Sequence, residues 1–146
     1  MRRGTTTSPL ERVTAVPDND PEMDAAIQKA RETLPSFVVA LQTPTTGDRH
    51  LLVKARFVEG ENSEHMWVAD LIAEGNTFRG VLADEPKFIK NLRFKQPIIV
   101  SRDQISDWMI VQDGKVKGAF TTRVLRSKLN PEKQRAFDQS LPYQFE

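Results

Sequence analysis

The sequence predicts an α+β fold, in which an N-terminal helix and C-terminal helices pack on a curled antiparallel sheet of about five or six strands. Apolar residues follow helical spacing near the two ends of the chain, whereas in the middle apolar and polar residues alternate with a period of two. Turn signals such as Asp113-Gly114 separate the alternating runs. A block of short strands between helices is typical of this fold class.

The N-terminal helix is predicted from its first residues. Asp20 supplies an N-cap carboxylate, and Pro21 suits the first helical position. Apolar residues at three- and four-residue steps extend the helix over residues 21–33. Pro35 is expected to interrupt it and to leave residues 36–42 as a second short helix.

The strands and the later helices follow from changes in periodicity. Residues 86–92 are expected to form one or two helical turns, with Phe88, Ile89 and Leu92 pointing inward. After Thr121 the pattern is helical again, and Asn130-Pro131 predicts the start of a last helix. Strands are predicted over residues 51–57, 63–73, 77–83, 97–101, 108–112 and 115–120.

Composition narrows the possible functions. The 146 residues carry a net charge of +1, which does not favour nucleic acid as a partner, and the absence of cysteine excludes thiolate chemistry. Residues 1–18 are polar and aperiodic, so we expect a flexible arm before a single α+β domain over residues 19–146. No apolar run is long enough to cross a bilayer, and no secretory signal follows Arg2-Arg3. As written the chain is predicted to be cytoplasmic; a removed signal peptide would make it periplasmic or a lipoprotein.

Three blocks in the middle of the chain hold both tryptophans and one of the two histidines. They are residues 64–68 (Glu-His-Met-Trp-Val), 105–109 (Ile-Ser-Asp-Trp-Met) and 118–125 (Gly-Ala-Phe-Thr-Thr-Arg-Val-Leu). Together with the start over residues 18–23, they resemble the YegJ-like bacterial family of unknown function, over about residues 18–138. The resemblance implies a small single domain without an assigned activity. Some relatives carry an export or lipoprotein signal.

A small polar site is one interpretation of the first two blocks. Asp107 could fix the tautomer of His65, as in general-base pairs, although His65 held by backbone at a sheet edge is the interpretation we prefer. Arg123 is expected to form an ion pair with Asp107 that ties the last helices to the sheet. Trp67 and Trp108 could form an aromatic platform for a ligand, but core supports are more typical of such positions. No catalytic residue, metal site or cofactor is predicted.

A basic stretch offers a binding surface. Lys87, Lys90 and Arg93 lie in a segment with further cations and no acidic residue, and an acidic protein partner would fit it at least as well as nucleic acid. We therefore predict a non-enzymatic protein-binding or accessory module, for which an immunity-like role is one form. The alternatives are a hydrolase-like or ligand-binding site around His65 and Asp107, or a cell-envelope protein. The sequence predicts neither the partner's identity nor the oligomeric state.

Overall fold

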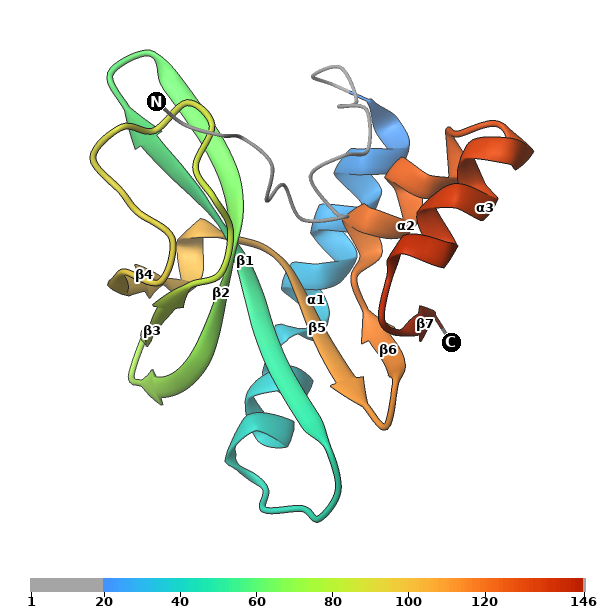
Figure 1. Cartoon of the computed structure of the whole chain (residues 1–146). Helices are drawn as coiled ribbons and strands as arrows, with labels where there is room; N and C mark the ends of the chain where they lie inside the picture. The colour runs from blue at the N-terminus through green and yellow to red at the C-terminus, as the bar shows by residue number, and fades with distance from the viewer. Residues whose placement is uncertain (1–19, 146) are drawn as a thin grey trace.

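The chain forms an α+β structure in which helices lie on either side of a seven-stranded sheet (Figure 1). The computed structural model describes residues 20–145, so the arm predicted over residues 1–18 lies outside the described residues. The α+β class is confirmed, and the strand number exceeds the predicted five or six. The elements in chain order are α1 (Pro21–Gln42), β1 (Arg49–Glu59), β2 (Asn62–Glu74), β3 (Thr77–Leu82), β4 (Pro97–Ser101), the 3₁₀ turn η2 (Arg102–Gln104), β5 (Ile105–Gln112), β6 (Lys115–Gly118), α2 (Phe120–Ser127), α3 (Pro131–Ser140) and β7 (Gln144–Phe145).

The strands are arranged in the order β4-β3-β2-β1-β5-β6-β7. Strand β1 is central and pairs with β2 and β5, and these pairings are antiparallel. The short strand β7 pairs with β6 in parallel. It was missed from the sequence because two residues carry no periodicity. Among residues 20–145 no helix is long and apolar enough to span a membrane.

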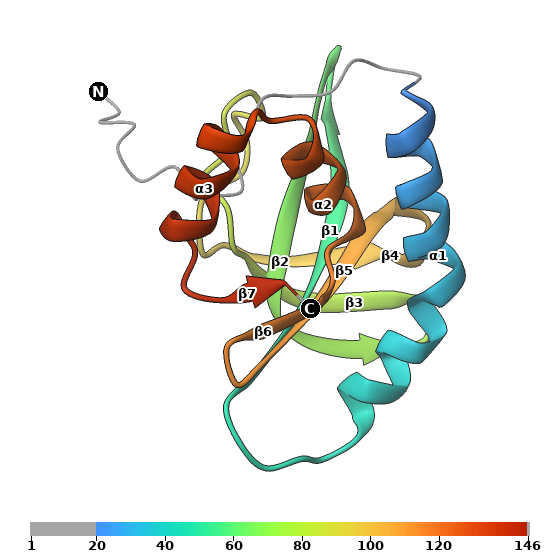
Figure 2. The ribbon, with the colours of Figure 1, turned by 90° about the vertical axis from the view of Figure 1, so that its right-hand side faces the viewer.

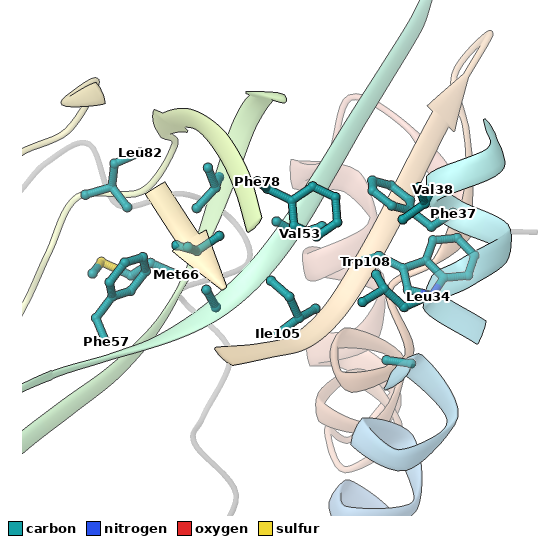
Figure 3. Close-up of a cluster of buried hydrophobic side chains, with 14 of the residues drawn as sticks. Leu34, Phe37, Val38, Val53, Phe57, Met66, Phe78, Leu82, Ile105 and Trp108 are labelled. Carbon is teal, nitrogen blue, oxygen red and sulfur yellow. The ribbon is translucent and has the colours of Figure 1, made fainter. Parts of the chain in front are cut away.

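Helix α1 continues through Pro35, so the predicted break at this residue is wrong. A proline inside a helix costs about 3 kcal/mol. Leu34, Phe37 and Val38 are buried against the sheet, and each contributes roughly 1.5–3 kcal/mol, so their packing outweighs the lost hydrogen bond. Figure 3 shows these side chains beside Trp108, whose ring centroid lies 5.6 Å from that of Phe37.

The two faces of the sheet carry separate apolar clusters. The larger one includes Met66 and Val68 and is covered by α1. Trp67 lies between these residues on β2, so its side chain points to the opposite face, where it packs in a smaller cluster with Met109, Val116 and Ala119. In Figure 2, α1 and α3 lie on opposite sides of the strands.

The connection from β3 to β4 does not contain the predicted helical turns over residues 86–92. The carboxylate of Glu64 accepts hydrogen bonds from the backbone N–H groups of Lys87, Phe88 and Ile89. These amides are directed at a side chain of β2, which replaces the bonding a helical turn would give them. Ile89 is buried as predicted, whereas Phe88 is 58% exposed, contrary to the prediction that it points inward.

Strand β5 begins at Ile105, three residues before the predicted start at Trp108. Lys54 pairs with Asp107 and Ala55 pairs with Ile105, which leaves Ser106 as the extra residue of a β-bulge. At the other end of the hairpin, β6 stops at Gly118 rather than at Phe120. Gly118 and Ala119 both have positive φ and turn the chain into α2.

Candidate functional site

The candidate site is built around the carboxylate of Asp107, which is completely buried. It accepts hydrogen bonds from the backbone N–H groups of Trp108, Phe120 and Thr121, and from the hydroxyl of Thr121. Two of these amides belong to the first turn of α2, whose N-terminal N–H groups have no partner inside the helix. Asp107 therefore acts as a cap supplied from the sheet, at the helix end where a negative charge is favoured.

Lys54 on β1 provides the positive charge beside this carboxylate. Its amine donates a hydrogen bond of 2.8 Å to the hydroxyl of Thr121 and lies 5.1 Å from the centre of the Trp67 ring. Burial lowers the pKa of Lys54, against the opposing effect of Asp107 and Asp84. Burial likewise raises the pKa of Asp107, against the opposing effect of Lys54 and of the hydrogen bonds that the carboxylate accepts.

The predicted ion pair between Asp107 and Arg123 is replaced by other contacts. The guanidinium of Arg123 donates to the backbone carbonyls of Gly118 and Val116, and it lies 4.9 Å from the centre of the Phe145 ring. Arg123 ties α2 to β6 and β7, while Lys54 takes the position beside Asp107. Asp107 and Arg123 thus each hold α2, but through different partners rather than through each other.

Asp84 is a second buried carboxylate on this side of the molecule, and no pattern in the sequence marks it. It is 4% exposed and accepts a hydrogen bond of 2.8 Å from the backbone N–H of Trp67. Tyr143 lies near it, and burial, together with the charge of Asp84, raises the pKa of Tyr143 to about 12. A carboxylate in a loop after a strand carries no periodic signal, so only the fold reveals its role.

His65 contacts Ser106 rather than Asp107 or backbone. The Nδ1 atom of His65 lies 2.9 Å from Oγ of Ser106, which is 4% exposed. Burial of the ring, together with the charges of Lys54 and Arg56, lowers the pKa of His65 to about 4. The imidazole is therefore neutral near pH 7. The sequence does not predict Ser106 as the partner of His65, because the orientation of Ser106 depends on the bulge.

The two tryptophans are core residues. Trp67 is 2% exposed and Trp108 is 7% exposed, and the indole N–H of Trp108 donates a hydrogen bond of 2.9 Å to the hydroxyl of Thr33. Neither ring presents a face on which a ligand could stack. This burial contradicts the alternative of an aromatic platform and agrees with the preferred interpretation, in which both residues support the sheet.

The basic stretch forms an exposed loop anchored at two points. Lys87, Lys90 and Arg93 are all exposed. The half-buried Glu64 accepts the three backbone hydrogen bonds described above, and Glu59 accepts a further one, 2.7 Å long, from the N–H of Lys90. The acidic side chains are thus directed at the backbone of the loop. We call residues 85–96 the basic loop.

The second group of basic residues, near the C-terminus, makes ion pairs on the surface. Arg126 forms a two-point contact with Asp138, with distances of 2.7 and 2.6 Å. Lys128 lies 2.8 Å from Glu22 and 3.4 Å from Asp20. These contacts join α2 to α3 and to the start of α1. Within the described residues, no group of three or more His, Cys, Asp or Glu is placed to hold a metal ion.

Comparison with known proteins places this chain in a bacterial family. The model of the family described as "Uncharacterized protein conserved in bacteria (DUF2314)" matches residues 20–145. A Neisseria meningitidis serogroup B protein, NMB1133/NMB1171, named as an ankyrin repeat protein, is 36% identical over 80 residues, which cover 55% of this chain and 32% of that protein. The uncharacterised protein YegJ of Escherichia coli is 27% identical over 99 residues, which cover 68% of this chain and 63% of YegJ. No solved structure matches the chain.

Proposed function

We propose that this chain, which belongs to the DUF2314 family of uncharacterised bacterial proteins, is a protein-binding module whose binding surface is the basic loop. The observation that carries the proposal is the exposure of two phenylalanines on this loop. Phe88 is 58% exposed and Phe94 is 47% exposed. Large aromatic side chains are among the residues that contribute most to protein–protein binding energy.

The loop is held in place before any partner arrives. Ile89 is 3% exposed and joins the core, while Glu64 and Glu59 fix four backbone amides of the loop. A surface ordered in advance loses little conformational entropy on binding, which favours affinity. A hollow of about 450 Å³ lies among the residues from Glu85 to Phe94 and could receive a side chain of the partner.

The charges define the chemistry of the partner. The basic loop that carries the phenylalanines also carries four exposed cations, Lys87, Lys90, Arg93 and Lys95, and the amine of Lys95 lies 5.4 Å from the centre of the Phe94 ring. A partner with an apolar centre and an acidic rim would complement this surface. The ankyrin repeat name of the Neisseria relative adds support, because such repeats present extended binding surfaces.

Affinity capture followed by direct binding tests the proposal. The tagged chain would recover a partner from the native cell, and the purified pair would then be compared between wild type and the Phe88→Ser/Phe94→Ser variant. We expect about 30-fold weaker binding for this variant, the effect of losing roughly 2 kcal/mol at binding hot spots. The Lys87→Glu/Lys90→Glu/Arg93→Glu variant should bind more weakly too, and wild-type binding should weaken with salt.

The control is Val39→Ser on α1, which removes an exposed apolar side chain (64% exposed) away from the loop. Its affinity should equal that of wild type. Unchanged binding by both loop variants, with every variant folded, would exclude the basic loop as the binding surface.

A further inference from the structure

A second polar cluster lies on the face of the sheet opposite to the basic loop. Neighbouring residues on a strand point to opposite faces, so His65 points away from the loop that Glu64 holds. In the register of the two strands, His65 on β2 lies opposite Arg56 on β1. Because β1 lies between β2 and β5, the contact of His65 with Ser106 passes over β1, between the side chains of Lys54 and Arg56.

The two cations beside His65 differ in their surroundings. Lys54 is matched by Thr121, the Trp67 ring and the buried carboxylate of Asp107. Arg56 is exposed, and within residues 20–145 its guanidinium makes no hydrogen bond or ion pair. Asp107 follows Ser106 on β5, but its carboxylate is directed at α2. The face around His65 therefore has an excess of positive charge.

Ser106 holds the imidazole of His65 at its Nδ1 atom. When the Ser106 hydroxyl donates to Nδ1, the ring proton is on Nε2, which can donate outward beside the Arg56 guanidinium. If the imidazole takes up a second proton, the same hydroxyl can turn and accept from Nδ1–H, because a hydroxyl serves as donor or acceptor. The pair thus tolerates both charge states of His65.

We propose that Arg56, His65 and Ser106 form a binding site for a phosphate oxyanion. The Arg56 guanidinium has the planar fork that matches phosphate oxygens, and the His65 imidazole supplies a second donor. Lys54, two residues before Arg56 on β1, adds positive charge on the same face of the sheet. The site is independent of the basic loop, so one can fail without the other. A bound phosphate anion would stabilise the imidazolium form of His65, so phosphate binding near pH 5 is accompanied by proton uptake at this ring.

Nitrogen-15 NMR of the imidazole rings in the full chain tests the site with inorganic phosphate as the probe. The chain has two histidines, and His50, which is exposed beside Asp48, serves as an internal reference. At constant ionic strength near pH 5, just above the His65 pKa of about 4, phosphate should shift the His65 nitrogens saturably toward the imidazolium signature. It should also raise the pKa of His65 by about one unit or more. The His50 signals should not change saturably.

Two variants complete the test. Arg56→Gln should weaken phosphate binding about tenfold or more, because one charge-assisted contact is lost. Arg79→Gln is the matched control, since Arg79 is exposed on β3 and paired with Glu74. It should behave as wild type. A His65 signal that does not saturate with phosphate, or that saturates equally in Arg56→Gln, would overturn the proposal.

Discussion

Asp107 on β5 holds the first turn of α2 through Thr121, whose backbone N–H and hydroxyl both donate to the same carboxylate oxygen. Lys54 reaches the other side of that hydroxyl from β1. The Thr121 side chain thus links α2 to both β5 and β1. Burial at this place makes any unmatched charge costly. Substitution of Asp107 is therefore expected to lower the stability of the fold strongly.

Replacing Asp107 with alanine should destabilise the fold by about 3–5 kcal/mol, the cost of leaving a buried charged partner unmatched. The change would leave the amides of Phe120 and Thr121 without their acceptor and would remove the carboxylate that most opposes the effect of burial on Lys54. Urea unfolding followed by circular dichroism measures the loss. Glu64→Ala is the comparison, and it should cost less because Glu64 is half-buried. Equal small losses for both variants would contradict the assigned role.

Trp108→Ala should cost about 3–5 kcal/mol, as expected for a large buried aromatic side chain. Trp108→Phe should recover much of this, yet remain below wild type because the hydrogen bond to Thr33 is lost. Chemical denaturation of the three proteins separates packing from hydrogen bonding. A loss under about 1 kcal/mol for the alanine variant would be incompatible with the packing of Trp108 against Phe37.

Pro35→Ala should stabilise the protein by about 1–2 kcal/mol, because alanine restores a helical N–H and removes the ring clash. The gain is smaller than the full helical cost of proline, because proline also restricts the unfolded chain. Pro35 is exposed, so the substitution leaves the core unchanged. Thermal unfolding would show a higher Tm. A lower Tm would mean that α1 depends on the proline.

Acidification should weaken the fold through His65. Its pKa is about 4 in the folded chain and 6.5 ordinarily, so the unfolded chain binds the proton more readily between these values. The stability contributed by neutral His65 is therefore complete above pH 6.5 and is lost as the pH falls toward 4. His65→Gln should flatten this part of the stability curve, whereas His50→Gln should not. Curves of equal slope for wild type and His65→Gln would refute the assignment.

Much of the architecture follows from local chemistry that the sequence displays. The Asp20 N-cap, the strand alternation around Val53 and the Asp113-Gly114 turn predicted their elements because each depends on neighbours in the chain. The helix break at Pro35 and the helical turns in the basic loop were predicted wrongly, because the structure at both places depends on residues distant in the sequence. Packing of Phe37 overrides the helix break, and the Glu64 carboxylate, 23 residues from Lys87 in the sequence, removes the helical turns.

The candidate sites show the same division. The sequence by itself marked Asp107, His65 and the cations of the basic loop as unusual, because residue type and pattern are local properties. Only the tertiary structure decided their partners: Lys54 and Thr121 for Asp107, and Ser106 for His65. These partners depend on the bulge at Ser106 and on the order of β2, β1 and β5. Both features arise from long-range strand pairing, which no local pattern in the chain specifies.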